Sequence, residues 1–166
     1  MFKLKKLSPE GIESALAKVE RYRLLNEPWE AESICLDILE IDPSNQTALV
    51  MLLLARTDQL GSEQGASLAD AQEIIPQLES EYDRTYYSGI ICERRAASLL
   101  ARDTAAAGQV AYQWFRRAME WYEQAEKIRP AGNDSALLRW NTCARAIMRH
   151  DHVRPVEREE MPQLLE

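Results

Sequence analysis

The sequence predicts an all-α protein in which helices pack in pairs, and three observations lead to this fold class. Only six glycines and two phenylalanines occur among the 166 residues, which leaves little material for a turn-rich β fold. Apolar residues recur at helical spacing in several long segments, and prolines follow some of them. One pattern of four residues also appears once in each half of the chain. Such a repeat is typical of folds that stack similar helical units.

The repeated pattern is a small residue, a larger one 4 positions later, an apolar or small one 3 positions after that, and a proline after 5 more. The two clear copies are Ala31, Cys35, Ile38 and Pro43, and Ala118, Tyr122, Ala125 and Pro130. The first three positions share one face of an α-helix, and the proline lies just past the helix end. A weaker copy, with aspartate in place of proline, is Ala71, Ile75, Leu78 and Asp83.

These segments resemble the second helix of a tetratricopeptide repeat, a helix-turn-helix unit with alanine, an aromatic residue and proline at these positions. Tyr22 lies 9 residues before Ala31, where this family has its first-helix tyrosine. The resemblance covers residues 12–149 and marks the chain as a divergent member. It implies a right-handed superhelix of about three repeats plus a C-terminal capping helix.

The helices of the first two repeats follow in chain order. We expect the first pair over residues 12–26 and 29–40, since Pro28 is suited to a helix start. The middle repeat begins with a helix over residues 45–60. Its second helix should be kinked or shortened, because Pro76 falls inside it.

The third repeat is stretched. Gly89, a plausible first-helix glycine, lies 29 residues before Ala118 where the family spacing is about 12, so both of its helices must be long. Asn133 and Asp134 supply an N-cap for one more helix. The remaining helices are thus expected over residues 82–101, 109–128 and 135–149, the last covering the open end of the stack.

The domain organisation is predicted to be simple. Residues 1–151 form the helical repeat domain, and residues 152–166, with two prolines and several glutamates, form a flexible tail. The start of the chain lacks the apolar stretch of a signal peptide, and no segment approaches the ~20 apolar residues of a membrane span. We therefore expect a cytoplasmic protein without a membrane partner.

Composition and motifs argue against several functions. The formal charge of -7 disfavours nucleic-acid binding, which needs a basic surface. Cys35, Cys92 and Cys143 lack C-x-x-C pairing, so we expect reduced, buried thiols. His150 and His152 are too few ligands for a zinc site. Phosphate-binding and nucleophile motifs are missing as well, so we expect no enzyme activity, no cofactor and no metal.

Trp114 and Trp121 are seven residues apart and therefore share one face of a helix. Two interpretations stay open for this face. It packs on the long preceding helix, which we favour because large exposed aromatic patches are uncommon on monomers, or it forms an exposed adhesive patch.

The resemblance also implies a concave groove, lined by the first helices of successive repeats, that receives a peptide. Carried over position by position, the groove residues are Leu16, Arg23, Val50, Leu54, Tyr86, Ile90, Arg94, Leu137, Asn141 and Arg145. One subclass of the family grips a C-terminal carboxylate through lysine, asparagine and arginine, and this set is missing here. The expected function is protein or peptide binding in another geometry, in which arginines can hold carboxylates.

Other functions remain open on the sequence alone. The chain could instead be a structural subunit that self-assembles, as a homo-oligomer or within a larger complex. It could also be a regulatory domain that senses a small ligand in an enclosed pocket. The tail from Val153 onward is a further candidate occupant of the groove.

Overall fold

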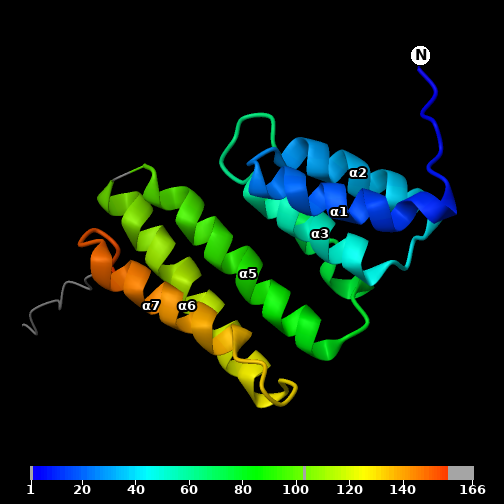
Figure 1. Cartoon of the computed structure of the whole chain (residues 1–166). Helices are drawn as coiled ribbons and strands as arrows, with labels where there is room; N and C mark the ends of the chain where they lie inside the picture. The colour runs from blue at the N-terminus through cyan, green and yellow to red at the C-terminus, as the bar shows by residue number, and fades with distance from the viewer. Residues whose placement is uncertain (1, 103, 157–166) are drawn as a thin grey trace, which may run out of the picture.

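The computed structural model describes residues 2–102 and 104–156, which form helices joined by turns, with no strand among them (Figure 1). The α-helices are Ile12–Leu24 (α1), Pro28–Ile41 (α2), Gln46–Asp58 (α3), Leu68–Gln72 (α4), Glu81–Leu100 (α5), Ala105–Lys127 (α6) and Ser135–Arg149 (α7). Two 3-10 turns are Pro9–Gly11 (η1) and Ile75–Gln77 (η2). The predicted all-α class is confirmed, and the helix ends differ from the expected ones by a few residues.

The helices stack in the order of the chain. α1 packs on α2, α2 on α3, and α3 on α4; after the turn at η2, α5 packs on α6 and α6 on α7. α1 also contacts α3, and α3 contacts α5, so the first helices of successive pairs adjoin one another. Figure 1 shows the result, with the blue α1 at one end of the stack and the orange α7 at the other.

The repeated sequence pattern forms the buried face of the second helices. Its members in α2 and α6 are all fully buried (0% exposed): Ala31, Cys35, Ile38, Ala118, Tyr122 and Ala125. α2 ends two residues before Pro43, and α6 ends before Pro130, as the stop signals predict. The helical periodicity therefore identified both the core face and the end of each helix.

The buried residues form two clusters. The first lies among α1, α2, α3, α4 and η2, and the second lies among α5, α6, α7 and Val153. Leu54 of α3 is partly buried and packs against both clusters, while Ile91 of α5 belongs to the first. Tyr87 of α5 also packs against both, so these three side chains join the two halves of the stack.

The second helix of the middle repeat is short, as Pro76 predicts. Ser67 caps α4, with its hydroxyl accepting from the Asp70 amide at 3.2 Å and the Asp70 carboxylate accepting from the Ser67 amide at 2.7 Å. α4 ends at Gln72, and Pro76 lies in the following 3-10 turn. Proline has no amide hydrogen to donate, so the α-helix cannot run through it. The middle repeat thus covers less of its neighbours than a full helix would.

The third pair is long, as the spacing of Gly89 and Ala118 predicts. α6 begins at Ala105 rather than at the expected residue 109, because the Thr104 hydroxyl accepts from the Ala107 amide at 3.2 Å and caps it. Gly89 lies against the Tyr122 ring, and a Cβ there would come within 2.5 Å of Cε1. A glycine at this position lets α5 and α6 approach closely around the aromatic ring.

The chain after α7 returns to the core. Val153 is buried (3% exposed) in the second cluster, and its amide donates to the His150 carbonyl at 2.9 Å. Gly108 at the start of α6 meets the backbone of His152, where a Cβ would lie 2.7 Å from the carbonyl carbon. The boundary predicted between residues 151 and 152 therefore falls inside packed chain. The predicted flexible tail otherwise lies mostly outside the described residues.

Replacing Gly108 with alanine should displace this returning segment and cost about 1–3 kcal/mol of stability, as overpacking usually does. The reason is the contact between the added methyl group and the His152 carbonyl. Faster hydrogen exchange at the Val153 amide, with a lower free energy of unfolding, would support this packing. Increased stability, which is the usual effect of glycine to alanine in a helix, would contradict it.

Candidate partner-binding surface

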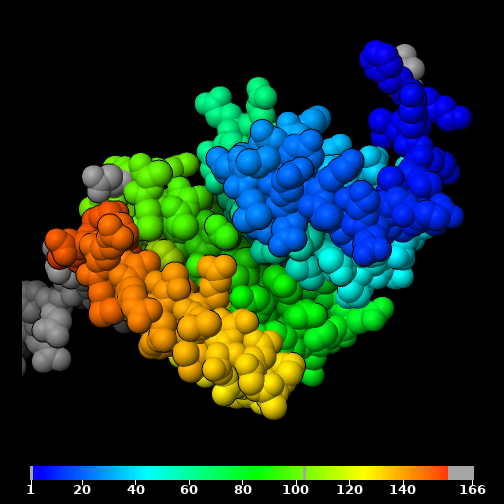
Figure 2. Space-filling model, viewed as in Figure 1, coloured from blue at the N-terminus to red at the C-terminus, as the bar shows by residue number. Residues whose placement is uncertain are grey.

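The first helices of the pairs present one face of the molecule. In Figure 2, green side chains of α5 lie between the blue α1 and the orange α7. This is the face on which the sequence places the groove. The structure brings some of the predicted groove residues together there and buries others.

Arg23 and Arg94 meet at one carboxylate where α1, α3 and α5 adjoin. Arg23 Nε donates to Asp58 Oδ2 at 2.9 Å, and Arg94 Nη1 lies 3.8 Å from Asp58 Oδ1. A hollow of about 390 Å³ opens beside them, and its other polar lining includes Asn26 and Ser98. We call this cavity the Arg23–Arg94 hollow.

The Arg23–Arg94 hollow has two positively charged side chains and one negatively charged side chain. Two guanidinium groups share a single carboxylate, so the cluster has a net positive charge in an acidic protein. The Nε of Arg94 is buried and has no hydrogen-bond partner among the described residues. Because two cations meet only one carboxylate beside an open hollow, this geometry favours a further anionic group as their partner.

A second charged group lies deeper, between α5, α6 and α7. Glu93 is buried (7% exposed); its carboxylate accepts from the Tyr122 hydroxyl at 2.6 Å and from Arg139 Nη1 at 3.1 Å. Burial and the neighbouring Glu93 charge raise the pKa of Tyr122 well above its usual range. Both carboxylate oxygens are occupied, so this group joins three helices rather than awaiting a ligand.

Tyr86 lies beside the buried group formed by Glu93, Tyr122 and Arg139. Its ring stacks on Tyr82 with 5.7 Å between centroids and is tilted against Tyr122 at 5.8 Å. The ring of Tyr87 meets Tyr86 edge-on at 5.1 Å. Tyr86 is half-buried, so it offers part of its ring to the surface.

The other predicted groove residues divide by exposure. Leu16, Val50 and Leu54 are partly buried against the core, and Asn141 is half-buried, whereas Leu137 and Arg145 are exposed. The prediction that Ile90 lines the groove is wrong. Its side chain is only 2% exposed, within the second cluster, and cannot contact a partner. The stretched α5 places Ile90 towards α6, on the same side as Gly89.

Sequence reasoning missed the acidic partners of the groove arginines. Asp58 ends α3, where the helix dipole disfavours a carboxylate, and this was a usable sign that a cation lies near it. Arg139 was not singled out either, and it holds Glu93 from 46 residues away in sequence. No local pattern reveals a pairing of that length.

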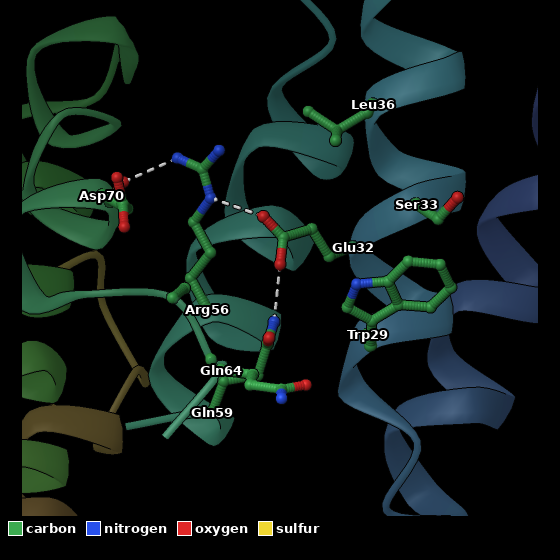
Figure 3. A pocket seen from close by; sticks show the side chains of 10 residues that line it. Trp29, Glu32, Ser33, Leu36, Arg56, Gln59, Gln64 and Asp70 are labelled. Carbon is green, nitrogen blue, oxygen red and sulfur yellow. Dashed lines mark hydrogen bonds and ion pairs between the residues drawn. The ribbon is translucent and has the colours of Figure 1, made fainter. Parts of the chain in front are cut away.

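Another hollow, of about 400 Å³, lies on the opposite helices, between α2, α3 and the loop before α4 (Figure 3). Glu32 accepts from Arg56 Nε at 3.0 Å and from Gln59 Nε2 at 2.6 Å, and Arg56 Nη1 donates to the Asp70 carbonyl at 2.7 Å. Trp29, 66% exposed, stands at its open side. These polar groups pair with one another and hold the loop before α4 in place. They leave no charged group of the described lining without a partner for a ligand to bind.

The three cysteines lie in the core, and two of the tryptophans lie at its edge. Burial raises the pKa of the Cys35 thiol to about 12 and that of Cys92 to about 11, and it also raises the pKa of Cys143. All three thiols are free and buried, as expected. Trp114 and Trp121 are half-buried against the second cluster, which agrees with packing, although both also border a hollow.

The rings of His150 and His152 meet edge to face, with their centroids 5.9 Å apart. Across residues 2–102 and 104–156, no group of three or more histidine, cysteine, aspartate or glutamate side chains is placed to hold a metal ion. No helix in these ranges is long and apolar enough to cross a membrane.

Comparison with known proteins gives no match, because no protein-family model, curated protein or solved structure is similar to this chain at a significant level. The resemblance to tetratricopeptide repeats therefore rests on the residues quoted above and on the helix order.

Proposed function

We propose that this chain is a non-catalytic protein-binding module of the tetratricopeptide type. In this proposal the stacked pairs form a right-handed superhelix whose concave face, made by α1, α3, α5 and α7, receives a segment of a partner protein. The Arg23–Arg94 hollow supports it most, because two arginines share one carboxylate there and the Arg94 side chain is 36% exposed. An acidic side chain of the partner would pair with the guanidinium groups.

Replacing Arg94 with alanine should weaken partner binding by about tenfold to a hundredfold, which corresponds to the 1.5–3 kcal/mol of a hydrogen bond to a charged group. The fold should persist, since Arg94 makes only the 3.8 Å contact with Asp58. Affinity capture from a cell extract would compare wild type, Arg94→Ala and Arg95→Ala. Arg95 is the matched control, because it neighbours Arg94 on α5 but does not border the hollow.

The expected result is one captured protein that is retained by wild type and Arg95→Ala and lost by Arg94→Ala. Titration of that protein against all three chains then gives the change in affinity. The same captured proteins at the same affinity for all three chains would refute the assignment of the hollow as a binding site.

Self-assembly is the second candidate, and the outer side of α7 favours it. Leu138 is 62% exposed and Met148 is 74% exposed on α7, where no other described helix covers them. Light scattering over a range of concentrations separates the two functions. A mass that stays at 19.0 kDa would exclude self-assembly.

A further inference from the structure

The shortened α4 leaves a partly apolar hollow beside α6. The cavity measures about 210 Å³; its apolar lining includes Ile75, Ile91, Trp114 and Trp121, and Gln72, Ser88 and Arg117 form its polar part. It exists because α4 ends at Gln72 and only a 3-10 turn follows, so no full second helix covers the tryptophan side of α6. Its volume is several times the ~30 Å³ of one liquid water, which is room for side chains.

A basic rim adjoins this hollow on the exposed side of α6. The Arg117 guanidinium lies over the Trp114 ring, 5.6 Å from its centroid, and both residues also border a neighbouring cavity of about 450 Å³. Arg116 and one acidic residue, Glu120, line that second cavity. Arginines outnumber carboxylates at this rim, although the whole chain has a charge of -7. The surface therefore fits an acidic segment with apolar side chains.

The described chain ends close to this surface. After the buried Val153, Arg154 and Pro155 border a cavity together with Ala105 and Gln109 at the start of α6. Residues 157–166, which lie outside the described residues, contain four glutamates, one arginine and three large apolar residues. Their composition is thus complementary to the basic rim and the apolar hollow.

The length of this segment is sufficient. Ten extended residues span up to ~33 Å, whereas the rise along α6 from Gln109 to Trp121 is about 18 Å. The path crosses the exposed side of α6, where Gln113 and Arg116 lie. Three of the four glutamates precede the leucines and only Glu166 follows them, so the main acidic group and the two leucines come in the same order as the rim and the hollow along this path.

We propose that residues 157–166 dock on α6 of the same chain. In this arrangement Leu164 and Leu165 occupy the hollow beside Trp114 and Trp121, and the preceding Glu159 and Glu160 lie beside Arg116 and Arg117. The segment takes the place of the missing turns of α4 and keeps the tryptophan side of α6 out of water. This docking does not depend on the proposed binding face, because it uses the opposite helices of the stack.

The test uses the full chain with Trp29 and Trp140 replaced by phenylalanine, so that Trp114 and Trp121 report alone. Trp29 is 66% exposed, and Trp140 makes an exposed hydrogen bond to Glu123, so both changes should preserve the fold. In this background, Leu164→Glu/Leu165→Glu should shift tryptophan emission to longer wavelength and increase quenching by acrylamide. Leu24→Glu/Leu25→Glu at the end of α1, where the two leucines are 82% and 60% exposed, is the matched control and should change neither.

A charge exchange makes the test specific. Glu159→Arg/Glu160→Arg should increase quenching as the leucine variant does, and adding Arg116→Glu, which leaves the Arg117 contact with the Trp114 ring in place, should bring the quenching back towards the original value. Equal spectra for the tail variants and the parent chain would overturn the proposal. Quenching that rises on dilution would also overturn it, since the segment would then come from a second copy.

Discussion

Replacing Tyr122 with alanine is expected to lower the free energy of unfolding by about 3–5 kcal/mol, the usual cost of removing a buried aromatic side chain. The ring is fully buried (0% exposed) between α5 and α6, and its hydroxyl donates to Glu93 at 2.6 Å. Its removal leaves a cavity and one unpaired carboxylate oxygen. Urea unfolding followed by circular dichroism at pH 7 measures the loss, and Tyr122→Phe, which keeps the ring, should cost only about 1–3 kcal/mol.

Gly89 supplies the control for this prediction, because its neighbour is the same ring. In the wild type, Gly89→Ala should destabilise, since the new Cβ would lie 2.5 Å from Tyr122 Cε1. In the Tyr122→Ala background the same change should stabilise by up to ~1 kcal/mol, as it does in an ordinary helix. The same sign in both backgrounds would show that Gly89 does not contact Tyr122 as described.

Raising the pH above 9 should destabilise the protein steeply. The pKa of Cys35 rises from 9.0 to about 12 and that of Cys92 from 9.0 to about 11, both mainly through burial, and the pKa of Cys143 also rises. In the unfolded chain these thiols ionise near pH 9, whereas the folded chain keeps them protonated. Their contribution is therefore fully present below pH 9 and is lost as the pH rises towards 11.

Three such thiols predict a loss that approaches roughly 4 kcal/mol per pH unit by pH 10, because each contributes at most about 1.4 kcal/mol per unit. Above pH 10 the half-buried Tyr87 and the buried Tyr122, whose pKa values are also raised by burial, add to the loss, so the thiol slope is read between pH 9 and 10. Unfolding by urea at several pH values measures this slope. Cys143→Ala should reduce the slope by about a third, whatever it does to stability at pH 7. A slope that is equal in the wild type and in this variant would contradict the burial of the thiol.

The part of the fold that the sequence predicted is the part encoded within single helices. Ala31, Cys35 and Ile38 share a helix face, and Pro76 predicts that the helix before it is short, as α4 is. The sequence predicted a start of α6 that is four residues too late. Thr104 caps the helix, but no apolar periodicity follows it directly to mark a helix start. The return of Val153 to the core was missed because a single apolar residue has no periodicity.

In the candidate site, too, the sequence predicted which helix face a residue lies on better than its contacts with other helices. Arg23 and Arg94 were expected in the groove from their helix positions, and they do meet. Their common partner Asp58 was not expected, and Ile90 was placed in the groove although it is buried. Both outcomes depend on contacts between helices, such as the close approach of Gly89 to the Tyr122 ring, which spacing along the chain does not reveal.

The order in which the helices stack also has a consequence for folding. Every major contact joins helices that are neighbours in the chain, or next neighbours in the case of α1 with α3 and α3 with α5. Forming each contact therefore closes only a short loop, which costs little chain entropy. Chains of low contact order fold quickly, and a linear stack can nucleate in either half. The molecule should therefore fold on the microsecond-to-millisecond timescale of small helical bundles, from either of its two cores.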